Sequence, residues 1–156
     1  MVEDKRLLED FAEQVRAKFP EYSSHLAPIP IELSKSPYHE AIGISWPSDA
    51  ERCRLSAYFR GDCFEVSFSV AGTRGPAEAQ IYGESDDDPH TMVKNTVLFL
   101  EDFFSEQIVV AVERCRWLWF PPYYLPFFRS LSERPFGHRV SEVLSWKSTY
   151  NERRQT

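Results

Sequence analysis

The stretch from Trp117 to Phe128 places the strongest constraint on how this chain can fold. It reads Trp-Leu-Trp-Phe-Pro-Pro-Tyr-Tyr-Leu-Pro-Phe-Phe, so seven of its twelve residues are aromatic, three are proline and none is charged. Proline fixes φ and has no N–H, which excludes the stretch from a helix interior or a central strand. We therefore expect an irregular, largely extended backbone whose rings either complete the core or form a contact surface.

Residues 52–60 and 63–70 predict a β-hairpin whose register can be checked from the sequence. Gly61-Asp62 between them is typical of a two-residue type II′ turn. This turn pairs apolar residues on one face: Phe59 with Phe64, Ala57 with Val66, Leu55 with Phe68, and Cys53 with Val70. The other face pairs Tyr58 with Glu65, Ser56 with Ser67, and Arg54 with Ser69. A shift of one residue would destroy this agreement, so we expect a buried face and a wetted face, with Cys53 pointing in and Cys63 out.

Two helices are predicted on either side of the hairpin. Over residues 4–19 the apolar residues recur at helical spacing, with Asp4 as the N-cap and Pro20 as the stop. The second helix runs from Pro89, a residue suited to the first helical position, to about residue 105. The aspartates before it favour the positive end of the helix dipole.

Further strands are predicted from residue type and alternation. Apolar and polar residues alternate before the second helix over residues 29–34, 41–46 and 77–83. The first of these contains Pro30, which indicates a sheet edge. The β-branched run within 107–113 favours a buried strand over a longer helix. Residues 139–147 fit either a strand or a short helix.

These elements predict an α+β fold. The simplest assembly is a single antiparallel β-sheet of about five to six strands, with two helices packed on one face and an irregular aromatic and proline-rich segment after them. A chain of 156 residues suits one domain, which we place at residues 1–150. Residues 151–156 are expected to be a frayed tail.

Charge and cysteine content narrow the class of protein. The net charge is −6, but residues 84–112 carry −6 and residues 113–156 carry +4. The two blocks either neutralise each other within the fold or form opposite faces that steer a charged partner. Three cysteines and a charged start without an apolar signal segment predict a cytoplasmic protein with free thiols. No apolar run is long enough for a membrane span, so no membrane partner is expected.

No motif in the chain specifies a reaction, a cofactor or a metal. Asp86 to Asp88 with His90 form the densest group of potential metal ligands, but their spacing matches no EF-hand loop. Cys115 is the best candidate nucleophile, because the arginines on both sides favour a thiolate, yet an idle thiol is the more frequent outcome. We therefore predict no cofactor, no metal site and no catalytic residue, and we favour a protein that is not an enzyme.

Nucleic acid and a WW domain are two further partners that the sequence suggests. Arginines mixed with aromatic residues after residue 113 suit stacked bases, but an acidic chain attracts phosphate weakly, so nucleic acid is not favoured. Pro121-Pro122-Tyr123-Tyr124 matches the PPxY pattern of WW-domain ligands, and such short matches arise often by chance.

The leading hypothesis is a domain that binds another protein without catalysis. Its size and acidity fit an immunity or inhibitor-type protein, or a chaperone-like accessory protein. The order of elements resembles that of secretion chaperones at the level of the fold alone. The candidate contact residues are Tyr123, Tyr124, Phe127, Phe128, Arg54, Tyr58, Glu65, Asp86 and Asp87. The rings nearer the predicted buried strand, Trp117, Trp119 and Phe120, are assigned to the core. An exposed strand edge also permits a homodimer.

The alternative hypothesis is a small-molecule-binding or hydrolytic domain. Its pocket would lie between the sheet and the helices and be lined by aromatic residues. This hypothesis predicts a concave, partly polar cavity near Trp117, Trp119 or Tyr123, with a histidine or Cys115 at its mouth.

Overall fold

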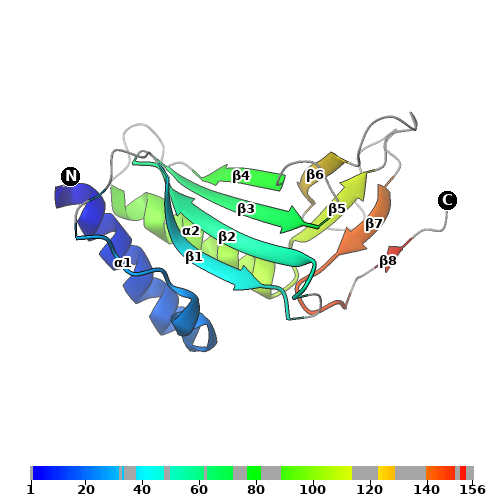
Figure 1. Ribbon diagram of the computed structural model, residues 1–156, viewed down its shortest axis with the longest axis horizontal. Helices are drawn as coiled ribbons and strands as arrows, with labels where there is room; N and C mark the ends of the chain where they lie inside the picture. Colours follow the sequence, from blue (N-terminus) through cyan, green and yellow to red (C-terminus); the bar gives the residue numbers. More distant parts are fainter. Residues whose placement is uncertain are drawn as a thin grey trace.

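Two α-helices, a short 3-10 helix and two antiparallel sheets make up the described part of the computed structural model (Figure 1). The structure describes residues 2–31, 33, 38–47, 50–61, 63–71, 77–81, 89–113, 123–128, 140–149 and 152–153. The elements are α1 (Val2–Lys18), η1 (Pro20–His25), β1 (His39–Ser45), β2 (Cys53–Phe59), β3 (Phe64–Val70), β4 (Ala77–Ile81), α2 (Pro89–Phe104), β5 (Val109–Glu113), β6 (Tyr123–Phe128), β7 (Val140–Leu144) and β8 (Glu152–Arg153). The predicted α+β class is confirmed.

The strands form two sheets instead of the single sheet expected from the sequence. The strand order is β1-β2-β3-β4 in the first sheet and β6-β5-β7-β8 in the second, and neighbouring strands are antiparallel. The second sheet lies at one end of the first, where α2 ends (Figure 1). The division into two sheets follows from the pairing of β5, the strand after α2. It pairs on both sides with strands from later in the chain, so it starts a new sheet.

β2 and β3 form the predicted hairpin in the predicted register. The seven pairs from Cys53–Val70 to Phe59–Phe64 are all present. Gly61 in the turn has a φ of +88°, which glycine adopts without steric cost. The apolar face of the hairpin is buried along its whole length. The alternation of residues in this sequence is therefore sufficient to specify which face turns inward.

α1 and α2 pack on that buried face of the first sheet. The ring of Phe11 from α1 lies 4.6 Å from the ring of Phe64, and the ring of Phe103 from α2 lies 4.6 Å from that of Phe68. α2 starts at Pro89, as predicted. α1 starts earlier than predicted, at Val2, so Asp4 lies inside the helix and is not its N-cap.

The strand predicted over residues 29–34 is wrong for the residues that are described there. Ile29 to Ile31 and Leu33 lie in no strand, and Ile31 is 90% exposed. Pro28 and Pro30 supply no N–H, so this segment cannot build a ladder. It touches the first sheet just before the prolines, where Ala27 N–H donates to the Ala41 carbonyl at 3.1 Å.

Part of the aromatic and proline-rich segment is a strand, which corrects the prediction of an irregular backbone for residues 123–128. β6 pairs with β5 at the edge of the second sheet. The register shifts between Val109 and Ala111, which face Phe128 and Leu125. The extra residue this places in β6 is a bulge beside Pro126. Proline is tolerated at an edge and at a bulge, which is why this strand can contain one.

The residues after 139 also form strands. Val140–Leu144 is β7, which decides between the strand and the short helix that the sequence left open. Glu152 and Arg153, within the segment expected to be frayed, form β8 opposite Val143 and Glu142.

A cluster of aromatic side chains joins the second sheet to the first. Trp146 follows β7 and is 1% exposed. Its ring lies 5.0 Å from Phe104, 5.5 Å from Phe103, 5.7 Å from Trp46 and 5.8 Å from Tyr22. Its indole N–H donates to the Tyr22 hydroxyl at 2.9 Å. Rings at these separations contribute beyond the area that they bury, so we call this cluster the aromatic junction.

Two carboxylates support the aromatic junction from outside. Arg52, which precedes β2, forms a two-pronged ion pair with Glu142 of β7 at 2.8 and 2.6 Å. Glu106 accepts the backbone N–H groups of Lys147 at 2.7 Å and Thr149 at 3.3 Å. Burial raises the pKa of Glu106, but these hydrogen bonds and those from the Thr149 and Ser145 side chains together hold it below its ordinary value. Glu106 thus anchors the turn that contains Trp146.

Glu106→Gln should make the protein less stable at neutral pH and less sensitive to acid. A carboxyl whose pKa is lowered on folding stabilises the fold above its unfolded pKa, and this contribution is lost as the pH falls through the folded pKa. We expect the free energy of unfolding at pH 7 to fall by about 0.5–1 kcal/mol, since the group is partly solvent-exposed. Urea titrations from pH 7 to pH 3 measure both effects. Glu13→Gln, at an exposed position of α1, is the control. An unchanged slope of stability against pH in Glu106→Gln would contradict the anchor.

Candidate functional site

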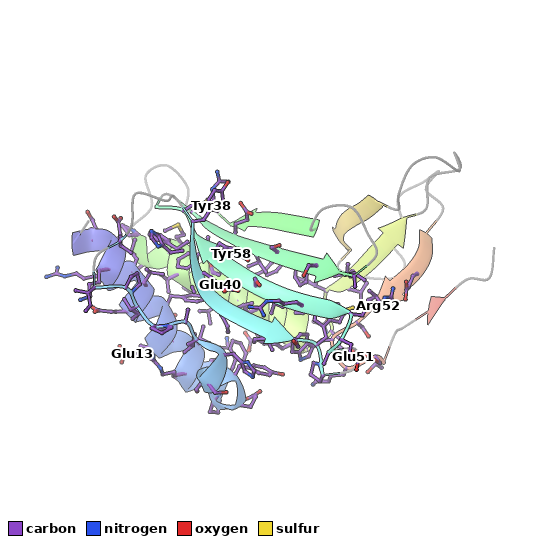
Figure 2. All side chains as sticks on the ribbon, viewed as in Figure 1. Glu13, Tyr38, Glu40, Glu51, Arg52 and Tyr58 are labelled. Carbon is purple, nitrogen blue, oxygen red and sulfur yellow. The ribbon has the colours of Figure 1, made fainter. Side chains whose placement is uncertain are left out.

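The face of the first sheet opposite the helices carries the hairpin residues to which the sequence assigns a contact role. We call it the outer face and define it by Tyr38, Glu40, Arg54, Ser56, Tyr58, Arg60, Glu65 and Ser67. Alternation along the strands turns these residues away from the core. Figure 2 shows Tyr38 near one end of the first sheet and Arg52 near the other, with Glu13 set apart on α1.

One half of the outer face is a hydrogen-bonded group across β1 and β2. Oε1 of Glu40 accepts from Nη2 of Arg54 at 2.8 Å and from the Ser56 hydroxyl at 3.1 Å. Nε of Arg54 donates to the same hydroxyl at 3.2 Å. Gly43 makes room for this group, because a Cβ there would lie 2.2 Å from Nη2 of Arg54 and 2.6 Å from Oε1 of Glu40. Both long side chains can therefore lie flat on the sheet.

The other half of the outer face is centred on Arg60. Its Nη1 donates to Oε2 of Glu65 at 3.0 Å, and its guanidinium carbon lies 4.7 Å from the centre of the Tyr38 ring. A guanidinium at this distance from a ring is attracted by its π electrons. Tyr58 faces Glu40 in the β1–β2 ladder and Glu65 in the β2–β3 ladder, so it lies between the two halves.

The expectation of a wetted hairpin face holds for only part of the outer face. Arg54 is exposed and Tyr58 is half-buried, but Ser56, Glu65 and Ser67 are buried. For Ser56 and Glu65 the reason is visible in the contacts, because the long side chains of Arg54, Glu40 and Arg60 lie along the sheet next to them. Glu65 therefore supports Arg60 and presents little surface of its own.

Cys63 is buried at 2% exposure, so the expectation that it points out to solvent is wrong. It follows the turn, where its carbonyl accepts the backbone N–H of Arg60 at 2.9 Å. Cys63 precedes β3, which begins at Phe64, so strand alternation does not fix its direction, and it packs in the hydrophobic core. Neither Cys53 nor Cys63 is in a disulfide bond, as predicted.

The other predicted contact residues are not brought onto the outer face by any described contact. Tyr123, Tyr124, Phe127 and Phe128 belong to β6 in the second sheet. The predictions for Asp86 and Asp87, for Cys115, and for Trp117, Trp119 and Phe120 lie outside the described residues.

The part of the chain that the structure describes contains no cluster of potential metal ligands. No three His, Cys, Asp or Glu side chains there lie close enough to hold a metal ion. Nδ1 of His90, one of the potential ligands, lies 2.7 Å from Oδ2 of Asp10, which links α2 to α1. Burial raises the pKa of Asp10, but its hydrogen bonds with Gln14 and His90 together hold it below its ordinary value.

A shallow recess lies between α1, β1 and the segment between them. It is lined by Leu8, Phe11, Ala12, Ala27, Pro28, Ile29, Pro30, His39, Glu40 and Ala41. The lining is mostly apolar and includes no serine, threonine or cysteine. Among these lining residues His39 therefore has no hydroxyl or thiol beside it of the kind that a histidine activates in hydrolytic sites.

Sequence reasoning missed Tyr38, Glu40 and Arg60. Arg60 could have been found, because the two-residue turn places it on the same face as Glu65. Glu40 requires the register of β1 against β2, which shifts between Glu40 and Ile42. No residue pattern signals this bulge, so the pairing of Glu40 with Tyr58 emerges only in the fold.

No protein-family model, curated protein or solved structure matches this chain. Among the described helices, none is long and apolar enough to cross a membrane. Any assignment of function must therefore come from the chemistry of the surface itself.

Gly43→Ala tests the close packing over the first sheet. The added methyl group should displace the ends of Arg54 and Glu40 while leaving the fold intact, because both side chains can rotate away. Lost contacts and the better strand propensity of alanine nearly cancel, so stability should change by less than about 1 kcal/mol. Urea unfolding and the NMR shift of the Arg54 Nε–H measure the two effects. A loss above about 2 kcal/mol, or an unchanged Arg54 resonance, would contradict this account.

Proposed function

We propose that the protein is a non-enzymatic cytoplasmic domain that binds another protein through the outer face of its first sheet. An inhibitor of the immunity type and a chaperone-like accessory protein are the two roles that fit. The observation that carries the proposal is the group of arginine and tyrosine side chains on this face. Glu40 holds Arg54, Glu65 holds Arg60, Arg60 contacts the ring of Tyr38, and Tyr58 lies between the two ion pairs in the strand ladders.

The composition of the outer face supports protein binding. Tyrosine and arginine dominate the binding energy of known interfaces, where they lie in ordered, well-packed surroundings. Arg54 and Arg60 are already held by hydrogen bonds, so a partner would immobilise fewer side chains on binding. A lower entropy cost leaves more of the contact energy as affinity.

The shape of the outer face supports the same class of ligand. The ends of Arg54 and Glu40 lie across the strands and fill the space over Gly43. Small molecules prefer concave, enclosed sites, whereas protein partners use broad surfaces. The alternative of a ligand-binding or hydrolytic domain has the recess beside His39 in its favour, but the described residues that line this recess include no serine, threonine or cysteine.

The charged side chains of the outer face are paired with one another, which favours a partner whose hydrogen-bonding groups match their positions. Glu40 pairs with Arg54, and Glu65 pairs with Arg60, so each cation has an anion beside it. Such paired charges give little long-range attraction and instead reward a partner whose own donors and acceptors match them. A second copy of this chain is one such partner, and a concentration-dependent change in sedimentation would reveal it.

Alanine variants of Arg54 and Tyr58 test the proposal once a partner is in hand. The tagged protein is purified from its native cell, the co-eluting protein is identified, and its Kd is measured with the pure components. Each variant should weaken binding by about tenfold to a hundredfold, as loss of a central interface side chain does. The matched control is Lys94→Ala at an exposed position of α2, which should bind as the wild type does.

Circular dichroism and melting curves show whether each variant is folded. Unchanged affinity in both folded variants would exclude the outer face as the contact surface. A partner that never accompanies the protein at a fixed ratio in repeated preparations would count against protein binding itself.

A further inference from the structure

The outer face carries no net charge, although the chain as a whole carries −6. Its charged residues are two arginines and two glutamates, Arg54, Arg60, Glu40 and Glu65, whose formal charges cancel. A net charge of −6 makes two copies of this chain repel each other at long range. A face whose own charges cancel adds nothing to that repulsion, so it is a surface at which two copies can meet.

The ion pair between Arg54 and Glu40 leaves hydrogen-bonding groups open to solvent. Arg54 uses Nε and Nη2 within its own chain, and Glu40 uses Oε1. Within the part of the chain that the structure describes, Nη1 of Arg54 and Oε2 of Glu40 have no hydrogen-bond partner. The two side chains are 50% and 37% exposed. The pair therefore offers an open donor and an open acceptor side by side.

A donor beside an acceptor is self-complementary about a two-fold axis. An axis that lies between two facing sheets, and passes between these two side chains, sets Arg54 of each copy over Glu40 of the other. Both cross-copy hydrogen bonds then form together, because the two contacts of such an interface are identical. An unrelated partner would have to supply both groups at the matching spacing, whereas a second copy has them already.

Two tyrosines lie next to this ion pair. Tyr58 pairs with Glu40 in the β1–β2 ladder, and Figure 2 shows the two residues beside each other on the first sheet. Tyr38, two residues before Glu40, is 49% exposed. A second copy placed over Glu40 and Arg54 would cover ring surface that now faces water. Tyrosine and arginine are the residues in which the binding energy of interfaces is concentrated.

We infer that the outer face binds a second copy of this chain in a two-fold dimer, with Arg54 of each copy opposite Glu40 of the other. This inference rests on the proposed function, since it names a partner for the same face. Exposed ion pairs each contribute little, so the dimer is weak, with a Kd of about 10 µM to 1 mM. A different protein that uses this face then competes with the second copy.

Charge reversal at the two contacts tests the inference on the pure protein. Sedimentation velocity from about 1 µM to about 1 mM should show a mass that rises with concentration from the monomer toward the dimer. Arg54→Glu alone, or Glu40→Arg alone, places like charges at both contacts and should raise the Kd at least about tenfold. An equimolar mixture of the two variants again joins an acid to a base at each contact. It should therefore form a heterodimer with the Kd of the wild-type dimer.

Lys94→Glu is the matched control, because it changes the net charge as Arg54→Glu does but lies at an exposed position of α2. It should dimerise as the wild type does. Circular dichroism shows whether each variant is folded. If a reversed charge prevents folding, Arg54→Gln and Glu40→Gln remove the same contacts more gently and should each raise the Kd by about threefold to tenfold.

Three outcomes would overturn the inference. A wild type that stays monomeric up to about 1 mM would show that the face does not bind a second copy. A dimer whose Kd neither reversal changes would place the self-association elsewhere on the molecule. A mixture of the two reversed variants that stays monomeric would show that Arg54 and Glu40 do not pair across the interface.

The outcomes also separate this inference from the proposed function. If the wild type stays monomeric while Arg54→Ala weakens binding of the co-purified protein, the outer face stands as a contact surface and the second copy falls. If the protein forms no dimer and Arg54→Ala leaves the affinity for the co-purified protein unchanged, both proposals fail together.

Discussion

The aromatic junction around Trp146 is the interaction on which the arrangement of the two sheets depends. It brings together Tyr22 from η1, Trp46 after β1, Phe103 and Phe104 from α2, and Trp146 after β7. These residues are far apart in the chain, so their packing closes long loops and offsets the entropy of doing so. Two carboxylates lie at the margin of the aromatic junction. Glu142 orients β7 through its ion pair with Arg52, and Glu106 orients the turn after β7 by accepting the backbone N–H of Lys147.

The proposed contact surface, the outer face, follows from this construction. The helices take one face of the first sheet, which leaves the other face to Arg54, Tyr58 and Arg60 with their carboxylate partners. The aromatic junction then holds the second sheet in place, because Trp146 after β7 packs against Trp46 after β1 and Phe104 of α2.

Local patterns in the sequence predicted the local structure well. The hairpin register follows from the alternation around Gly61, and Pro89 marks the start of α2. The division into two sheets could not be predicted, because it depends on β5 finding partners that follow it in the chain. Similarly, the sequence identified Arg54 and Tyr58 as outward residues but could not show that Glu40 reaches them, since a bulge sets that register. The burial of Glu65 depends on how the long Arg60 side chain lies across the sheet, and Cys63 packs in the core from a position outside the strand, so alternation predicts neither.

Hydrogen exchange in a Trp146→Ala variant tests most directly whether the aromatic junction holds the second sheet against the first. The account predicts that backbone amides of β5 and β7 lose protection by about two orders of magnitude, because removing a buried tryptophan costs several kcal/mol locally, while β2 and β3 keep theirs. Trp146→Phe should retain most of the protection. Unchanged exchange of β5 and β7 in Trp146→Ala, or an equal loss across both sheets, would contradict the account.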